Sequence, residues 1–247
     1  MKDFFSIYAF LIGLIVGSFL SMLIPRLHNE ESGIFFGRSH CAKCKHKLGA
    51  ANLIPLISFL VQKGKCAFCD KKISVIYPLI ELTSALTFLA LSYQENFIIN
   101  AILFSILIFI FFYDFLYQEI HDVVMIPGIL LALIFSIYLG NVETALLGSA
   151  IGILFFGLQW IISKGKWLGS GDIRIGAFMG LILGWEMTLV AIMISYLLGS
   201  IYSIYLLATK QASKKTAIPL GPFLSLGTAI AFFYGEAIID CYLNFMI

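Results

Sequence analysis

Long apolar stretches recur from one end of the chain to the other, and they constrain its fold more than any other feature. Of the 247 residues, 60% are hydrophobic and only 12% are charged, whereas soluble domains carry roughly 25% charged residues. A helix needs about 20 apolar residues to cross the hydrocarbon core of a bilayer, and several stretches approach or exceed that length. The sequence therefore predicts an all-α polytopic integral membrane protein.

About eight transmembrane helices are expected. The first is interpreted as a retained span and not as a signal peptide, because its apolar run is long and ends at Pro25-Arg26 without a small-residue cleavage site. The sixth is short and rich in glycine, which is typical of a tilted or partly re-entrant helix. No internal repeat is evident. The predicted spans are residues 4–24, 74–93, 97–113, 123–140, 143–163, 173–184, 187–208 and 219–243.

Basic residues are concentrated in alternate connections, and this pattern predicts the topology. The polar loop of residues 25–73 holds nine Lys and Arg residues, and six more lie on the same side of the spans: five in the connections after the fifth and seventh spans, and Arg174 at the start of the sixth span. Cytoplasmic loops are enriched in Lys and Arg, so all of these connections are expected to be cytoplasmic. The N-terminus with Lys2 then lies outside, and the short outer connections, such as Trp185-Glu186, carry acids.

Two Cys-x-x-Cys pairs lie in the large loop, Cys41 with Cys44 and Cys66 with Cys69, and 21 residues separate the pairs. Four thiolates in two such pairs are typical of a tetrahedral zinc site, and four protein ligands leave no open position for catalysis. A cytoplasmic loop is kept reduced, which disfavours disulfides. The sequence therefore predicts a structural Zn²⁺ site, and a redox or disulfide role becomes the better interpretation only if the topology is inverted.

Two histidines, His40 and His46, flank the first cysteine pair. Imidazole nitrogens also bind zinc, so either histidine is an alternative ligand. We expect both to be solvated neighbours of the site.

Two acids are predicted to lie at the same membrane boundary. Asp114 ends the third span, and Asp172 closes the sequence Gly169-Ser170-Gly171-Asp172 at the start of the sixth. Two carboxylates that meet at a partly dehydrated site share a proton. One then acts as a base on water while the other protonates the carbonyl or the leaving amine, which is the chemistry of aspartic proteases. For Asp172 the alternative is an ordinary helix N-cap.

Further polar groups are candidates for a supporting role. Asp122 lies eight residues after Asp114, and Glu81 lies about two turns inside the second span. An acid within a membrane helix is expected to be functional, although the sequence does not identify a partner for Glu81. Backbone groups near Gly169 and Gly171 are candidates for hydrogen bonding to a substrate or an oxyanion, because glycine permits close approach.

These motifs together resemble the bacterial type IV prepilin peptidases, a family of GxGD membrane aspartyl proteases (peptidase A24) also known as leader peptidase-N-methyltransferases. Two differences from the family pattern stand out: Ser21 replaces an asparagine, and His121 replaces a proline. The matching segments occur in the family's order: Gly17-Ser18-Phe19-Leu20-Ser21, Arg38-Ser39-His40-Cys41, Asn52-Leu53-Ile54-Pro55-Leu56-Ile57-Ser58, Tyr77-Pro78-Leu79-Ile80-Glu81-Leu82, Asp114 with Asp122, and Gly169-Ser170-Gly171-Asp172.

The resemblance implies a location and an activity. Asp114 and Asp172 are implied to be the catalytic pair, and the four cysteines to bind zinc. The implied reaction is cleavage of a prepilin or pseudopilin leader after a glycine at the cytoplasmic face of the bacterial inner membrane. The substrates belong to a type IV pilus, a competence system or a type II secretion system. Membrane lipids are further expected partners, and nucleic acid is not.

Family members often methylate the new N-terminal residue with S-adenosylmethionine, and this second activity is associated with the N-terminal half. The resemblance therefore implies a methyltransferase-associated region at residues 1–93 and a membrane aspartyl peptidase domain at residues 94–247. The Ser21 difference lies in the first region and weakens the methylation prediction slightly. No glycine-rich nucleotide motif is visible, so the sequence does not locate a site for S-adenosylmethionine.

Three alternatives remain open at this point. The chain is a peptidase that has lost methylation, a transporter or proton relay that uses the same acids, or a structural membrane module in which both aspartates are helix caps. A transporter is expected to show repeated halves and acids distributed through the depth of the membrane. Here both key acids are predicted to lie on one face.

Overall fold

The computed structural model describes residues 2–31, 37, 39–41, 43–211 and 218–246. Three basic residues used in the topology prediction, Arg38, Lys214 and Lys215, lie outside the described residues. Over the described ranges the chain is helical, with two isolated β-bridges and no strands, so the all-α prediction is confirmed. The chain divides into two compact units, Met1–Phe109 and Ile110–Ile247.

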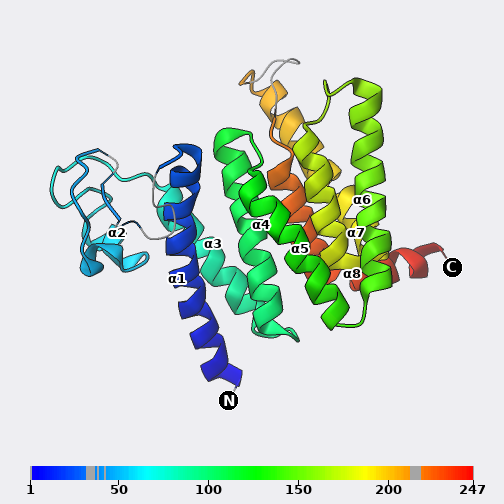
Figure 1. Ribbon diagram of the computed structural model, residues 1–247, viewed down its shortest axis with the longest axis horizontal. Coiled ribbons are helices and arrows are strands. Elements are labelled where there is room, and N and C mark those ends of the chain that lie inside the picture. The colour runs from blue at the N-terminus through cyan, green and yellow to red at the C-terminus, as the bar shows by residue number, and fades with distance from the viewer. Residues whose placement is uncertain (1, 32–36, 38, 42, 212–217, 247) are drawn as a thin grey trace. The chain divides into compact units, whose positions relative to one another are not determined.

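The first unit is built on two helices that cross closely, α1 and α3 (Figure 1). Gly13 and Gly17 allow this approach, because a Cβ on either glycine would lie 2.6–2.7 Å from a Cα of α3. Small residues four positions apart are a common means of bringing membrane helices together. The helices of this unit are α1 (Lys2–His28), η1 (Ala50–Leu53), α2 (Ile57–Val61), α3 (Ile76–Leu91) and the first part of α4 (Phe97–Tyr117).

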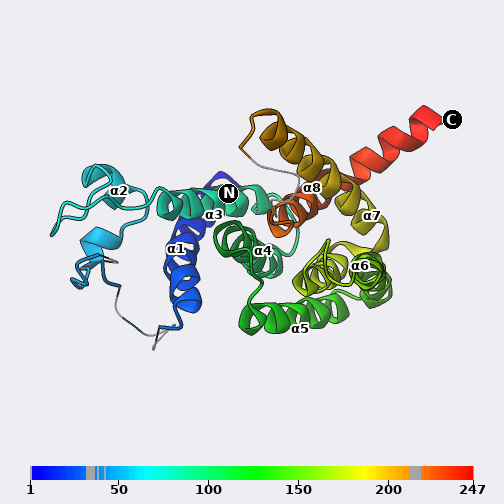
Figure 2. The same cartoon turned by 90° about the horizontal axis from the view of Figure 1, so that it is seen from above.

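The second unit is organised around α7, which packs along α6 and α8 and also contacts α5 (Figures 1 and 2). Its helices are the end of α4, α5 (Asp122–Tyr138), α6 (Val142–Ser163), α7 (Ser170–Ala208) and α8 (Gly221–Met246). Polar side chains buried in this unit mostly bond to a carbonyl of the preceding helical turn, as Ser195 and Thr228 do. In that arrangement each buried hydroxyl has a hydrogen-bond partner without any water molecule.

The helix α7 is broken at one residue, Gly184, whose φ of 76° and ψ of 177° are not helical. Figure 1 shows that α7 is not one straight helix but turns back along its length. Glycine adopts positive φ without a steric penalty, so the reversal needs no loop. A break was predicted here, but its assignment to Trp185-Glu186 is wrong, because both residues belong to the second helical segment.

Five helices are long and apolar enough to cross a membrane: α1, α4, α6, α7 and α8. Two shorter apolar helices, α3 and α5, have 16 and 17 residues. Counted with α7 as two segments, the described residues contain eight apolar segments, the number that the sequence predicts. The chain is a multi-pass membrane protein.

The contact between α6 and α7 is a seam of four glycines. Gly148 and Gly152 on α6 face Gly180 and Gly176 on α7, and a Cβ on any of the four would lie within 2.2–2.6 Å of atoms of the facing helix. The backbones therefore touch directly, which is the packing that small-xxx-small patterns permit in membranes. Because Gly176 lies one turn after Asp172, the seam also sets the position of that aspartate.

Replacing Gly180 with alanine is expected to lower the thermal stability of the protein in detergent. The added Cβ would lie 2.2 Å from the backbone of Gly148, and overpacking of this kind typically costs about 1–3 kcal/mol in the free energy of unfolding. The matched control is Gly157→Ala on α6, where the new Cβ meets nothing within 4 Å. Equal melting temperatures for the two variants would contradict the tight α6–α7 seam.

Candidate active site and metal centre

Asp114 lies in the last turn of α4 and is 6% exposed. The helix was predicted to end at residue 113. Instead, the apolar residues that follow Asp114 are also helical, and α4 ends at Tyr117. The Oδ2 atom of Asp114 accepts a hydrogen bond of 2.8 Å from the backbone N–H of Gly221, at the start of α8. Asp114 is therefore held inside the second unit by a residue 107 positions away.

Asp172 is the third residue of α7 and is 7% exposed. The N-cap position belongs to Gly169, so the alternative that Asp172 itself occupies the N-cap is wrong. The side chain nevertheless contributes to capping, because its Oδ2 accepts a 3.0 Å hydrogen bond from the Gly169 N–H. Both acids belong to the second unit, and the turns that carry them pack together through Ile120 and Gly171. The fold therefore brings these two acids, from α4 and α7, into neighbouring turns of one unit.

The turn after Asp114 packs against the turn that carries Asp172. A Cβ on Gly171 would lie 2.6 Å from the Ile120 side chain, so glycine at this position makes room for isoleucine. Next to this contact, Asp122 forms an ion pair with Arg174, and both side chains are substantially exposed. Asp122 thus has a structural partner, and exposed pairs of this kind contribute little to stability.

Glu81 belongs to the first unit, where it is 8% exposed on α3. Its Oε2 accepts a 2.8 Å hydrogen bond from the Leu56 N–H, and α1 lies directly against the same residue, because a Cβ on Gly17 would lie 2.6 Å from the Glu81 Cα. The sequence did not identify a partner for Glu81. The structure shows that its carboxylate bonds to the backbone of the loop before α2 and that α1 lies against this residue. These contacts tie the loop to the helix pair α1 and α3.

Gly221 was not singled out from the sequence, although one signal for it exists. It opens the last apolar segment, on the side of the membrane to which the predicted topology assigns both aspartates. It also stands between Pro219 and Pro222, which restrict the backbone on either side. Without the tertiary structure, however, no spacing rule connects it to Asp114.

The four loop cysteines form one cluster, with sulfur atoms that all lie within 4.8 Å of one another. All four are free thiols. The positions of the sulfurs fit a single tetrahedral metal ion of the kind that four cysteines bind. The described residues contain no other such group of His, Cys, Asp and Glu side chains.

Each cysteine pair lies in the same backbone turn. In residues 39–48, the Cys41 N–H donates to the His46 carbonyl and the Lys45 N–H donates to the Cys41 carbonyl, both over 2.9 Å. The turn of residues 64–73 repeats both bonds, with the same lengths, at equivalent positions. The loop therefore contains a short internal repeat that was not identified from the sequence, although each segment carries its Cys-x-x-Cys pair at the equivalent positions.

Two of the four thiols have shifted pKa values, in opposite directions. Backbone hydrogen bonding from Cys44 outweighs burial and lowers the pKa of the Cys41 thiol to about 6. A backbone hydrogen bond from Lys71 lowers the pKa of the Cys69 thiol. Burial and the neighbouring thiols together have a larger effect in the opposite direction, and the pKa is raised to about 11. The thiolate is the form that binds metal. The lowered pKa therefore favours the metal-binding form at Cys41, whereas the raised pKa of Cys69 favours its protonated form.

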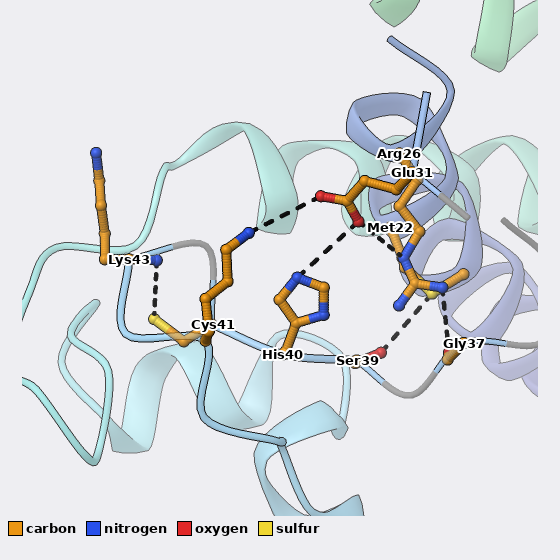
Figure 3. Close-up of polar contacts among 9 residues, drawn as sticks. Met22, Arg26, Glu31, Gly37, Ser39, His40, Cys41 and Lys43 are labelled. Carbon is orange, nitrogen blue, oxygen red and sulfur yellow. Dashed lines mark hydrogen bonds and ion pairs between the residues drawn. The ribbon is translucent and has the colours of Figure 1, made fainter. Parts of the chain in front are cut away.

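Neither flanking histidine belongs to the cysteine cluster. The His46 ring stacks on Phe68 of the second turn, with 3.7 Å between the ring centroids. His40 lies instead beside Glu31, with 3.9 Å between His40 Nε2 and Glu31 Oε2 (Figure 3). Glu31 also faces Arg26 at the end of α1 and Lys45 in the first turn, both at 4.0 Å. These contacts connect the first cysteine turn to α1.

Comparisons with known proteins agree with the motifs. The family model for the bacterial peptidase A24 N-terminal domain matches residues 11–95, and that for the type IV leader peptidase family matches residues 101–204. A prepilin leader peptidase/N-methyltransferase from Bacillus subtilis is 34% identical over 242 residues, which cover 95% of this chain and 96% of the relative. One from Pseudomonas aeruginosa is 30% identical over 274 residues, covering 98% and 94%.

A third relative of the same name, from Myxococcus xanthus, is 33% identical over 223 residues, which cover 86% of this chain and 66% of the relative. No solved structure matches the chain significantly. The family predicted from the sequence motifs is confirmed by the two family models and by relatives aligned over nearly the whole chain. The chain belongs to the type IV leader peptidase family, whose members include the prepilin leader peptidase/N-methyltransferases.

Proposed function

We propose that this chain is an aspartic endopeptidase that cleaves the leader of type IV prepilins or pseudopilins after a glycine. One observation carries the proposal: Asp114 and Asp172 are buried in one helical unit, in neighbouring turns that pack together through Ile120 and Gly171. Each carboxylate has Oδ2 held by a backbone amide, and no hydrogen bond to either Oδ1 occurs among the described residues. Two buried acids with one available oxygen each are suited to share a proton.

The proposed reaction consumes one water molecule and forms no covalent enzyme intermediate. One carboxylate removes a proton from water as the water oxygen attacks the scissile carbonyl carbon, and the other, protonated, carboxyl gives its proton to the carbonyl oxygen. When the tetrahedral intermediate collapses, the C–N bond breaks and the amine takes the proton held by the first carboxyl. The hydroxyl of the intermediate returns its proton to the second, which restores the starting state.

The proposed location is the cytoplasmic face of the bacterial inner membrane. The positive-inside rule favours that face for the cysteine loop and both aspartates, with the N-terminus outside. A prepilin has a basic leader followed by an apolar helix, so its scissile bond lies at the depth predicted for the two acids. The lysines of the loop are proposed to contact anionic lipid headgroups. The substrates belong to a pilus, competence or type II secretion system.

Methylation of the new N-terminal residue is proposed as a second activity, supported by the names of the relatives, which are prepilin leader peptidase/N-methyltransferases. S-adenosylmethionine is the proposed second substrate. The amine nitrogen forms a bond to its methyl group as the sulfur–methyl bond breaks, the nitrogen loses a proton, and S-adenosylhomocysteine leaves. Residues 1–93 are proposed to carry this activity and residues 94–247 the peptidase. Zn²⁺ on the four cysteines is proposed to be structural. No residue is assigned to S-adenosylmethionine.

The purified full-length chain in lipid nanodiscs is expected to shorten a prepilin to its mature length, with the new terminus after a glycine. Mass spectrometry of the product identifies the cut. With radiolabelled S-adenosylmethionine, the mature product is expected to gain one methyl group. Cleavage without methylation would show a peptidase that has lost the second activity, and the absence of cleavage with several prepilins would contradict the proposed function.

A further inference from the structure

Gly221 touches the carboxylate of Asp114 in two ways. Its amide donates a hydrogen bond to Oδ2, and an ideal Cβ on Gly221 would lie 2.6 Å from the same oxygen. Real Cβ atoms essentially never show contacts under 3.0 Å. The hydrogen bond and the missing side chain are therefore linked, because only glycine lets the start of α8 approach this closely with the carboxylate in this position.

The start of α8 leaves the Gly221 amide available for this contact. The first N–H groups of a helix have no partner within the helix. Pro222 has no N–H to offer, and the amides of Phe223 and Leu224 both donate to the Leu220 carbonyl over 3.0 Å. At this helix end, the Gly221 amide is thus the N–H group that donates to the Asp114 carboxylate.

Asp172 is held by the same kind of contact at the start of α7, where the Gly169 N–H donates to its Oδ2. Two helix starts therefore each fix one oxygen of one acid. The Oδ1 atoms remain for the shared proton and the attacking water. Rotation of Asp114 away from Gly221 would move its Oδ1 as well, because the two oxygens belong to one planar group.

We propose that Gly221 is a positioning residue for leader cleavage: its amide and its lack of a side chain hold Asp114 in the orientation that the reaction requires. This inference rests on the proposed peptidase function. The tightest contact is with Oδ2, at the end of a flexible side chain, so an alanine at 221 is accommodated by rotation of Asp114 and by a shift of a few tenths of an ångström that relieves the 3.0 Å contacts with its Cβ and Cγ. The larger cost is expected in catalysis and the smaller one in folding.

Gly221→Ala in the full-length protein is expected to lower kcat for prepilin cleavage about 10²-fold, the scale of loss that a misplacement of about 1 Å produces. KM is expected to stay close to the wild-type value, because the substrate-binding surface is unchanged. Methylation of an already mature pilin peptide is expected to continue. The control is Gly199→Ala, where the new Cβ lies in ordinary contact with Phe223 at 3.5 Å.

The outcomes separate this inference from the proposed function. A wild type that does not cleave contradicts the function itself. An active wild type with an inactive Asp114→Asn variant and a fully active Gly221→Ala variant overturns the inference alone. A Gly221→Ala variant that raises KM and leaves kcat unchanged also overturns it, because Gly221 would then act on substrate binding.

A second measurement does not depend on the fold of the glycine variant. In solid-state NMR of the protein in lipid, Asp114→Ala is expected to move the Gly221 amide proton upfield, because its acceptor is removed. Asp122→Asn, whose partner is Arg174, is the control and is expected to leave that proton unchanged. A Gly221 amide shift that is the same in the wild type and in Asp114→Ala would overturn the proposed contact.

Discussion

Asp114→Asn and Asp172→Asn are each expected to lower the rate of leader cleavage by at least about 10²–10⁴-fold, the usual contribution of a general acid or base. Asparagine has nearly the shape of aspartate but neither accepts nor donates the transferred proton. Both variants are expected to stay folded, because the amide oxygen of asparagine still accepts a backbone hydrogen bond. The measurement is single-turnover cleavage of a prepilin by the purified variants in nanodiscs.

The capping contact at Asp172 makes the Asp172→Asn variant informative. The amide oxygen of the new asparagine can still accept the Gly169 N–H bond that the Asp172 carboxylate accepts over 3.0 Å. If Asp172 were only a cap, the asparagine variant would retain its activity. A large loss of cleavage with an unchanged melting temperature therefore separates catalysis from capping. In the same way, Asp114→Asn can keep the hydrogen bond from the Gly221 N–H, so a loss of cleavage in this variant also separates catalysis from a structural role.

Asp122→Asn is the matched control for both variants. Asp122 is in the same part of the chain, but its side chain is half exposed and ion-paired to Arg174. An exposed pair contributes roughly 0–1 kcal/mol, so cleavage is expected to remain near the wild-type rate. If Asp122→Asn is inactive and Asp114→Asn is active, the assignment of the pair is wrong.

A wild type that conducts protons across the membrane but cleaves no prepilin would instead support the alternative that the same acids form a proton relay.

The prediction that the two aspartates lie at one membrane face depends on patterns that local sequence carries. Apolar length gives the spans, and the distribution of lysine and arginine gives their direction. These two patterns together bring Asp114 and Asp172 to one predicted face. The positions within the helices were less accurate, since aromatic residues after Asp114 extend α4 by one more turn to Tyr117.

Contacts between distant segments could not be predicted in the same way. The bond from Gly221 to Asp114 joins residues 107 positions apart, and it depends on how α8 packs in the second unit. The reversal at Gly184 was predicted as a loop, because apolar periodicity shows where a span ends but not that one glycine can reverse the chain. The partner of Glu81 is a backbone N–H, which no side-chain pattern records.

The second substitution that is expected to have a large effect removes a metal ligand from the cysteine loop. Cys66→Ser is expected to remove the metal from the purified protein, which otherwise is expected to contain one zinc per chain. Cys66 is the most buried of the four thiols, at 4% exposure, and a hydroxyl is a poor substitute for a thiolate ligand of zinc. The zinc content is measured by inductively coupled plasma mass spectrometry. Cys241→Ser is the control, because Cys241 is exposed on α8 and outside the cluster.

Loss of the metal is expected to unfold the two cysteine turns. The stacking of His46 on Phe68 joins them, but one ring contact is a small core for a loop whose helix α2 has only five residues. Structural zinc sites contribute on the order of 10 kcal/mol to the folding of small domains. The loop of residues 39–73 is therefore expected to become rapidly cleaved by added trypsin, which finds many lysines there, while the helices remain protected.

The two proposed activities are expected to respond differently to this change. Cys66 lies in the unit proposed to carry methyl transfer, whereas Asp114, Asp172 and Gly221 lie in the other unit. Methylation of a mature pilin peptide is therefore expected to fall at least about 10-fold, the lower limit of losses seen when even the surroundings of a metal site are changed, while leader cleavage persists. A zinc-free variant with full methylation would show that the metal-bound loop serves another purpose. A variant that keeps its zinc would exclude Cys66 as a ligand.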